Sequence, residues 1–400
     1  MKEKPNVVMM GLGYIGLPTA GLIASRGLKV TGVDIREEVV RTINQGKIHI
    51  VEPALDGLVH HVVKEGHLKA ATAPVKANVY LIAVPTPFKG NHEPDLAYVL
   101  SATKALIPTL EKGALVILES TSPVGTTEKI RDLIFEHRPE LEGAIYLAYC
   151  PERVLPGNII YELKHNDRAI GGIDEASTEK AMEFYNHFVV GELHPTNSKT
   201  AEMVKLVENA SRDNQIAFAN ELSIICDKAG IDVWELIRLA NKHPRVNILR
   251  PGTGVGGHCI AVDPWFIVSE FPEEAQLIRK SRELNTYKTE WVLEKIKNAA
   301  LQFKLKNGRD AVIACMGLAF KPDIDDLRES PALYVAEELK RQNFQTLEVE
   351  PNLEVANDRL LTLTEEAIEK ADIITFLVAH KGFKKLTIPQ NKQVLDFVGI

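Results

Sequence analysis

In the first half of the chain, short apolar runs alternate with helical patterns. Residues 6–10 predict a strand, residues 17–25 an apolar helix, and residues 29–33 a second strand that ends on Asp34. Further strands are predicted at residues 79–84, 115–119 and 145–148, and helices at residues 37–44, 96–107 and 128–135. Alternation of this kind predicts a parallel, doubly wound sheet.

From about Lys199 the pattern becomes purely helical. Residues 199–229 form a long helical run without Gly or Pro, and Asn197 or Ser198 is a suitable cap for its start. Residues 233–241 and 274–297 also have helical patterns. These runs predict a central all-helical segment.

The α/β alternation resumes after a charged stretch, residues 305–310, that contains Gly308. Strands are predicted at residues 311–316, 346–349 and 371–378, and a helix at residues 332–341. The expected fold is therefore α/β, with two Rossmann-like doubly wound domains joined by the central helical segment. The expected boundaries are residues 1–197, 198–304 and 305–400.

The composition narrows the function classes. A chain of 400 residues with a net charge of −7 and no basic block does not suggest nucleic-acid binding. No apolar run reaches the ~18–20 residues that span a bilayer, and the charged residues 1–5 do not resemble a signal peptide. Four widely spaced cysteines fit a reducing cytoplasm, and the histidines show no metal-ligand spacing. We expect a cytoplasmic protein without a membrane or metal partner.

A dinucleotide site is predicted at the first strand–helix turn. Gly11, Gly13 and Gly16 form a GxGxxG sequence between a strand and a helix, which allows backbone N–H groups to approach a pyrophosphate. Asp34 ends the second strand, where a carboxylate suits a ribose 2′-hydroxyl and repels a 2′-phosphate, so NAD is favoured over NADP. The alternative is a Rossmann-like domain for another nucleotide.

Two more loops follow predicted strands and are expected at the same edge of the sheet. They carry Thr86 and Thr121, which would then face the cofactor. Ordinary turn chemistry explains the same Ser, Thr and Pro residues equally well.

Cys259 is the most reactive-looking residue of the chain. It lies in a glycine-rich loop, residues 251–264, whereas Cys226 and Cys315 lie in a predicted helix and strand, and Cys150 at a strand end. Asp263, just downstream, would be either a functional carboxylate or the cap of the next helix.

Polar residues elsewhere supply candidate partners for this thiol. Lys205, Asn209 and Arg212 share one face of the long helix, either as a stripe that binds oxyanions or as a solvated face. Glu152 follows a strand of the first domain and is either a general base or part of a surface charge pair with Arg153.

Taken together, these motifs resemble the nucleotide-sugar 6-dehydrogenases, the family of UDP-glucose dehydrogenase. The likeness covers essentially the whole chain, in the stretches GLGYIGLP, PTP, STSPVGT, CPERVLPG, KxxEN, GVGGHC and FKPDIDDLRES. The Gly-Gly-His-Cys form at residues 256–259, with IHIVEP and HPRVNIL, is similar to the branch that oxidises N-acetylated sugars. One departure is the end at Asp396-Phe-Val-Gly-Ile400, which lacks the family's usual basic residue, so a late ligand contact would be absent or made by the backbone.

The resemblance implies a role for each matching residue. Cys259 would be the nucleophile, Lys205 and Asn209 would assist proton transfer and stabilise oxyanions, Asp263 would position the lysine or a water, and Glu152 would activate water. The NAD site would comprise Gly11, Gly13, Tyr14, Ile15, Gly16, Asp34, Thr86, Thr121 and Arg328. The substrate site would comprise Arg153, Val154, Lys205, Asn209, Arg212, His243, Arg245, Gly256, Phe320 and Lys321.

The implied reaction is a four-electron oxidation of UDP-N-acetyl-D-mannosamine with two NAD, for a surface polysaccharide such as an enterobacterial-common-antigen-like polymer. The resemblance also implies a homodimer through the central helices, in which Arg245 would serve the neighbouring subunit. The same chemistry on UDP-GlcNAc, UDP-GalNAc or UDP-glucose remains open, as do a single-step hydroxyacid dehydrogenase and a non-catalytic NAD-sensing scaffold.

Overall fold

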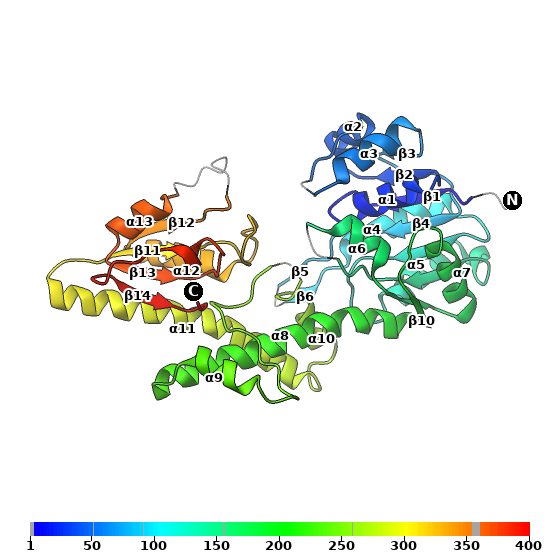
Figure 1. Ribbon diagram of the computed structural model, residues 1–400. Coiled ribbons are helices and arrows are strands. Elements are labelled where there is room, and N and C mark those ends of the chain that lie inside the picture. Colours follow the sequence, from blue (N-terminus) through cyan, green and yellow to red (C-terminus); the bar gives the residue numbers. More distant parts are fainter. Residues whose placement is uncertain (1–3, 51, 91, 155–156, 258, 354–360) are drawn as a thin grey trace. The chain divides into compact units, whose positions relative to one another are not determined.

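A computed structural model describes residues 4–50, 52–90, 92–154, 157–257, 259–353 and 361–400 (Figure 1). Some residues of the quoted motifs lie outside these ranges: Val51, Leu155, Pro156 and His258. The chain divides into two compact units, Met1–Val207 and Glu208–Ile400. The expected boundaries at residues 197 and 304 stay a prediction.

The first unit contains an eight-stranded sheet with the strand order β10-β9-β8-β7-β4-β1-β2-β3 (Figure 1). Its strands are β1 (Val7–Met10), β2 (Val30–Val33), β3 (Leu68–Ala71), β4 (Val79–Ile82), β7 (Leu115–Leu118), β8 (Tyr146–Tyr149), β9 (Arg168–Gly172) and β10 (Leu193–Asn197). The predicted parallel core is confirmed. However, β9 runs antiparallel to β8, and β10 runs parallel to β9. A short hairpin of β5 (Phe88–Lys89) and β6 (Glu93–Pro94) stands apart from this sheet.

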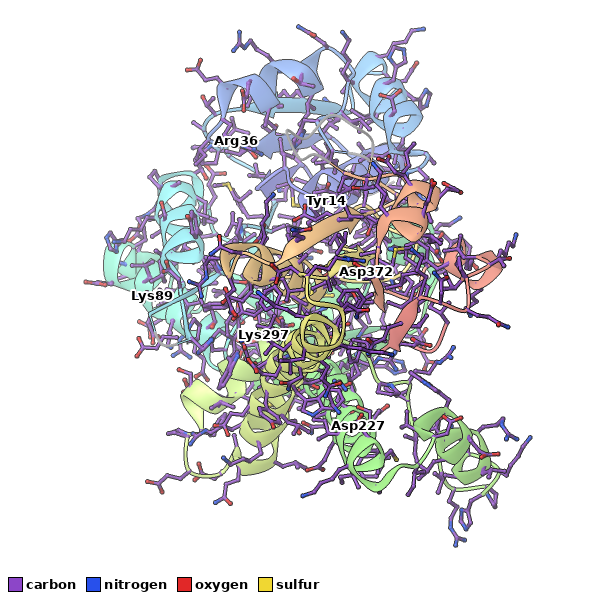
Figure 2. The ribbon with its side chains drawn as sticks, turned by 90° about the vertical axis from the view of Figure 1, so that its left-hand side faces the viewer. Tyr14, Arg36, Lys89, Asp227, Lys297 and Asp372 are labelled. Carbon is purple, nitrogen blue, oxygen red and sulfur yellow. The ribbon has the colours of Figure 1, made fainter. Side chains whose placement is uncertain are left out.

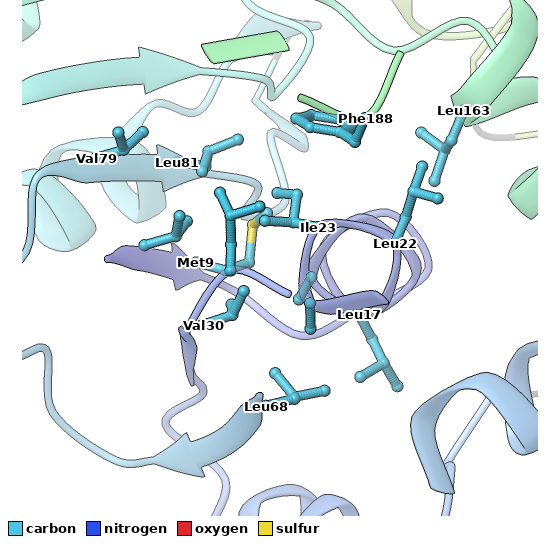
Figure 3. Packing of buried hydrophobic residues seen from close by; sticks show 14 of the residues in the cluster. Met9, Leu17, Leu22, Ile23, Val30, Leu68, Val79, Leu81, Leu163 and Phe188 are labelled. Carbon is cyan, nitrogen blue, oxygen red and sulfur yellow. The ribbon is translucent and has the colours of Figure 1, made fainter. Parts of the chain in front are cut away.

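Helices cover both faces of the first sheet, because alternate strand residues are apolar on both sides. One face packs α1 (Gly16–Ser25), α2 (Glu37–Asn44), α3 (Leu55–Lys64), α6 (Ile159–His165) and α7 (Glu175–Tyr185). The other face packs α4 (Ala97–Leu106) and α5 (Thr126–His137). Within the first face, Ile23 of α1 lies beside Met9 of β1, and Leu22 points toward Leu163 of α6 (Figure 3). These packed faces fix the carboxyl ends of the parallel strands at one edge.

The second unit combines long helices with a smaller sheet. Its helices are the later part of α8 (Ser198–Ala229), α9 (Val233–Ala240), α10 (Asp263–Glu270), α11 (Gln276–Asn307), α12 (Pro331–Arg341) and α13 (Thr364–Lys370). Four parallel strands follow the order β12-β11-β13-β14, namely β11 (Val312–Met316), β12 (Gln345–Val349), β13 (Ile373–Phe376) and β14 (Gln393–Asp396). The predicted second α/β domain is confirmed. No helix among the described residues is long and apolar enough to cross a membrane.

The helix ends follow local signals, with one error in the prediction. Asn197 caps α8, because its side-chain oxygen accepts the N–H of Thr200 at 2.9 Å. The helix predicted at residues 274–297 continues to Asn307, where Gly308 ends it with a φ of 69°. The extra turns are held in place because Ala299 and Ala300 are buried against the second sheet.

A buried carboxylate of α8 holds the start of α5. Glu202 is fully buried, and its oxygens accept the N–H groups of Gly125 at 2.6 Å and Thr127 at 2.8 Å, and the Thr127 hydroxyl at 2.7 Å. All three donors lie at the N-terminus of α5, where a helix has unpaired N–H groups and favours negative charge. Glu202 therefore fastens the loop that follows β7.

We expect Glu202→Ala to lower the free energy of unfolding by about 2–4 kcal/mol, because buried donors lose their acceptor. Glu111→Ala is the control, since Glu111 pairs with Lys76 on the surface, where solvent screens an ion pair and it adds little to stability. Urea denaturation followed by circular dichroism measures both. Equal losses in the two variants would show that Glu202 does not fasten the loop.

Candidate active site

The fingerprint glycines of the first unit have distinct packing roles. A Cβ on Gly11, whose φ is +93°, would lie 2.5 Å from the Ala83 oxygen, and one on Gly16 would lie 1.9 Å from the Gly11 oxygen. A Cβ on Gly13 would have no described atom outside its neighbouring residues within 4 Å. The first and third glycines are thus required by the protein's own packing, while the second leaves its side open, as the approach of a pyrophosphate requires. The turn therefore fits a dinucleotide.

Asp34 lies beside this turn at the end of β2. One carboxylate oxygen accepts the Leu12 N–H at 3.3 Å, and the other accepts the Arg36 N–H at 3.0 Å and contacts the Arg36 side chain at 3.3 Å. Tyr14, in the turn itself, is 45% exposed (Figure 2), and Ile15, which precedes α1, is partly buried. The predicted ribose-binding carboxylate is thus held against the fingerprint.

The two threonine loops meet at the carboxyl ends of neighbouring strands. The Thr86 hydroxyl donates to the Thr121 carbonyl at 2.6 Å, and the Ser120 hydroxyl donates to the Val84 carbonyl at 2.7 Å. Because β4 pairs with both β1 and β7, these loops lie at the edge from which the fingerprint turn emerges. The structure therefore brings Thr86 and Thr121 together by a hydrogen bond between the two loops, a contact that two independent turns would not need.

Glu152 and Lys205 form a largely buried ion pair in the first unit. The Lys205 ammonium donates to the Glu152 carbonyl at 2.9 Å and lies 3.5 Å from its carboxylate, with side chains 9% and 14% exposed. The second carboxylate oxygen accepts the Val154 N–H at 2.9 Å. Arg153 instead donates to the Asp167 carbonyl at 3.4 Å. Glu152 is therefore a largely buried partner of Lys205 and not an exposed surface charge, and Lys205 is not solvated.

Asn209 and Asp263 form a second polar contact, in the second unit. The Asn209 amide donates to the Asp263 carboxylate at 2.5 Å, and Asp263 is buried. The alternative of Asp263 as a helix cap is wrong, since it is the first residue of α10 and Val262 precedes it without a side-chain cap. Arg212 is exposed, as a solvated helix face would have it.

Cys259 is the exposed cysteine of the chain, whereas Cys150, Cys226 and Cys315 are buried. Its carbonyl accepts the N–H groups of Val262 at 3.1 Å and Asp263 at 2.8 Å, so the backbone turns directly into α10. This distribution agrees with the expectation that Cys226 and Cys315 are core thiols and that Cys259 is accessible.

The glycines before Cys259 allow a close approach to the loop after β11. A Cβ on Gly256 would lie 2.3 Å from the Glu329 carbonyl and 2.9 Å from the Phe320 Cβ, and one on Gly257 would lie 2.8 Å from the Phe320 ring. The Gly257 N–H also donates to the Arg328 carbonyl at 3.2 Å. Predicted substrate residues Gly256 and Phe320 are therefore neighbours, and Lys321 is exposed beside them.

Two predicted substrate residues lie on the surface of the second unit. His243 and Arg245 are both exposed, and the Arg245 N–H donates to the His243 ring at 3.3 Å. The Asn241 side chain spans this segment by bonding both backbone groups of Ile248. Their roles stay predictions.

Glu350, a carboxylate that no sequence motif singled out, holds the loop after β11. Glu350 follows β12, and its oxygen accepts the N–H groups of Leu318 at 2.8 Å and Ala319 at 2.9 Å and contacts His380 at 3.0 Å. Burial alone would raise the pKa of Glu350, but His380 and the two N–H groups lower it below its ordinary value. Its place after a second strand, like that of Asp34, was the available signal. The described residues contain no cluster of three or more His, Cys, Asp or Glu that could hold a metal.

Comparison with protein families covers most of the chain. Residues 5–189 match the NAD binding domain of the UDP-glucose/GDP-mannose dehydrogenase family, residues 199–287 its central domain, and residues 314–398 its UDP binding domain.

Individual proteins of known name are similar over the full length. The UDP-N-acetyl-D-mannosamine dehydrogenase of Campylobacter jejuni is 54% identical, with 99% of this chain and 100% of that protein covered. The NDP-N-acetyl-D-galactosaminuronic acid dehydrogenase of Ralstonia nicotianae is 52% identical, with 99% and 96% covered. The solved UDP-D-ManNAc dehydrogenase of Pyrococcus horikoshii has a TM-score of 0.88 at 39% identity, covering 98% and 95%. The chain therefore belongs to the UDP-glucose/GDP-mannose dehydrogenase family, and it is an NAD-dependent enzyme that oxidises a nucleotide sugar.

Proposed function

We propose that the chain oxidises UDP-N-acetyl-D-mannosamine at C6 to the carboxylate, with two NAD consumed per substrate. The observation that carries this proposal is the exposed thiol of Cys259 in a glycine-rich loop packed on Phe320. A thiol can take the reaction past the aldehyde, because the thiohemiacetal that it forms can lose a second hydride. The identity to proteins named for this substrate supports the choice of sugar.

NAD, held at the fingerprint turn of the first unit, would supply the acceptor for one hydride in each of the two oxidation steps. After the first oxidation, the Cys259 thiolate adds to the C6 aldehyde and forms a C–S bond. After the second, the thioester is attacked by water, the C–S bond breaks, and the thiolate is regenerated with the carboxylate. The alcohol and water protons pass to protein carboxylates and solvent.

The contacts Glu152–Lys205 and Asn209–Asp263 would act on the oxygen atoms that change charge during these reaction steps. Lys205 and Asn209 would stabilise the oxyanions of the thiohemiacetal and of thioester hydrolysis, where fixed donors are most effective. Glu152 would activate the hydrolytic water as a general base, and Asp263 would hold Asn209 or a water in place. The sheltered pair of Glu152 and Lys205 supports these roles, because low exposure strengthens a charge interaction.

The remaining predicted residues would bind the two ligands. For the cofactor we propose the three fingerprint glycines, Tyr14, Ile15, Asp34, Thr86 and Thr121, with Arg328 at its phosphates. For the UDP-sugar we propose Arg153, Val154, Arg212, His243, Arg245, Gly256, Phe320 and Lys321.

We further propose a cytoplasmic homodimer that requires no metal, assembled through the central helices, with a product destined for a surface polysaccharide. Large apolar side chains on these helices support the dimer. Phe218 and Ile225 of α8 are 52% and 53% exposed and lie two turns apart on one face, and Leu239 of α9 is 55% exposed.

The substrate is tested with a panel of UDP-sugars and NADH counted per sugar. We expect two NADH with UDP-N-acetyl-D-mannosamine, and we expect Cys259→Ser to lower turnover by at least about 1,000-fold, because the nucleophile is lost. Cys226→Ser is the control, since that thiol is buried in α8. One NADH per sugar, or undiminished carboxylate from Cys259→Ser, would rule out the covalent route. Preference for the N-acetylgalactosamine epimer would favour the likeness to the Ralstonia protein.

Asp34→Asn should weaken NAD binding about tenfold or more, because an amide replaces the charged acceptor proposed for the ribose. Asp56→Asn, an exposed carboxylate in the first turn of α3, is the matched control. Fluorescence titration with NAD measures both affinities. An unchanged affinity of Asp34→Asn would remove Asp34 from the cofactor site.

Phe218→Glu should convert the proposed dimer to a monomer, because a charge is expensive in an apolar interface. Leu305→Glu serves as the control, since Leu305 is 88% exposed near the end of α11. Sedimentation velocity distinguishes the two states. A dimer in both variants would place the interface elsewhere.

A further inference from the structure

The Cys259 loop, defined here as residues 252–257 and 259–262, is anchored at both ends to a buried polar network. At its far end, Arg282 Nη1 of α11 lies 3.3 Å from the carbonyl oxygen of Ile260, the residue directly after Cys259, and donates a hydrogen bond to it. The same nitrogen donates to Asp213 Oδ1 of α8 at 2.8 Å. Asp213 therefore orients the guanidinium that holds the backbone beside the thiol.

The near end of the loop is tied to the same carboxylate. The Gly252 N–H donates to Asn220 Oδ1 at 2.9 Å, and the Asn220 amide donates to Asn285 Oδ1 at 2.9 Å. The Asn285 amide in turn donates to Asp213 Oδ1 at 2.8 Å and to the Asp213 carbonyl at 3.1 Å. One carboxylate oxygen thus connects the anchor at Gly252 with the anchor at Ile260.

The network is costly to bury, which argues that it does more than stabilise the helix pair. Asp213, Asn220 and Asn285 are fully buried, and Arg282 is 4% exposed. Replacing a buried ion pair by apolar residues is often neutral or stabilising, so packing of α8 on α11 does not by itself require this one. Burial raises the pKa of Asp213 to about 6, against the opposing effects of Arg282 and Asn285, so the carboxylate is largely ionised at neutral pH.

We propose that Asp213 and Arg282 are positioning residues that hold the Cys259 loop in its reactive conformation, a role that rests on the proposed function of Cys259 as the nucleophile. The loop itself is rich in glycine, and Gly257 adopts a φ of +82°, so its own backbone gives little rigidity. A displacement of about 1 Å at a reacting atom can lower a rate by about 100-fold. The two anchors remove that freedom on either side of the thiol.

The test compares two buried basic side chains of α11, Arg282 and Lys288. Lys288 is 1% exposed and donates to Ser223 of α8 at 2.7 Å, as Arg282 donates to Asp213, but Ser223 and the Trp291 ring, which Lys288 also contacts, lie outside the Cys259 loop. Arg282→Met and Lys288→Met each replace a buried basic side chain of α11 by an apolar one, and the melting temperature of each variant shows how far it is destabilised. Arg282→Lys and Asp213→Asn, which keep a charge or an acceptor in place, are milder variants for use if Arg282→Met does not fold.

Three quantities are measured on the full-length protein: kcat and KM with UDP-N-acetyl-D-mannosamine, the rate of Cys259 alkylation by iodoacetamide followed by peptide mass spectrometry, and the affinity for NAD. We expect Arg282→Met to lower kcat about 100-fold with a KM change below about threefold, and to change the alkylation rate at least about fivefold. Arg282→Lys and Asp213→Asn should show smaller changes in the same direction. Lys288→Met should keep both rates, and NAD affinity should be unchanged in every variant.

Equal losses of kcat in Arg282→Met and Lys288→Met, or an alkylation rate that stays at the wild-type value in Arg282→Met, would overturn the proposal. The alkylation rate reports the position and environment of the thiol without turnover. Full activity of Cys259→Ser would instead overturn the proposed nucleophile while leaving the measured effect of Arg282 on the thiol intact, so the two failures are distinguishable.

Discussion

A carboxylate removed from water costs several kcal/mol unless donors replace its hydration, and this constraint organises the loops of both units. Glu202 takes its donors from the start of α5, and Glu52 takes the N–H groups of Gly157 and Ile159, at the start of α6. Glu350 takes the N–H groups of Leu318 and Ala319 after β11. Since each acid needs several donors at once, and a loop supplies them only in one conformation, the burial of the acid selects that conformation of the loop.

A carboxylate that accepts several hydrogen bonds also occurs in the proposed cofactor site and beside the proposed nucleophile, but with different donors. Asp34 accepts the Leu12 N–H and so sets the fingerprint turn against β2, and its position at the strand end is the one expected of a ribose-binding carboxylate. Asp213 accepts only side-chain donors at its Oδ1 and transmits its constraint through Arg282 and Asn285. Other charged groups that cross between α8 and α11 lack this connection: Asp227, near the end of α8 (Figure 2), pairs with Lys295 at 2.5 Å with both side chains more than a third exposed. Burial, rather than charge pairing as such, distinguishes the acids that fasten loops.

Elements and motifs could be read from the sequence because they depend on local spacing. The spacing of apolar residues and the placement of glycines predicted β1, α1 and β2 almost to the residue. The contrast between a cysteine in a loop and cysteines in helices and strands singled out Cys259. Long-range partners could not be predicted, since no local pattern says that Glu202 reaches α5 or that Arg282 reaches Ile260. The same limit explains the reversed β9, and it explains why the partners of Asp263 and Glu152 could not be predicted. Glu350 is an exception, because its position just after the second strand of an α/β unit is a local signal by which the sequence could have identified it.

Glycine-rich loops allow a close approach of the backbone to its neighbours, but they are flexible. Without a Cβ, Gly256 and Gly257 can lie against Phe320 and the Glu329 carbonyl, an approach closed to any larger residue. The same residues lose the most conformational entropy on ordering, so the loop would sample many positions if nothing outside it supplied contacts. In the fingerprint turn, α1 begins directly at Gly16 and supplies that order. The Cys259 loop reaches α10 only at Asp263, and its own backbone bonds cover little more than the last turn before that helix. An external frame is therefore required, and the connected side chains of Asn220, Asn285, Asp213 and Arg282 have the burial and the hydrogen bonds to supply it.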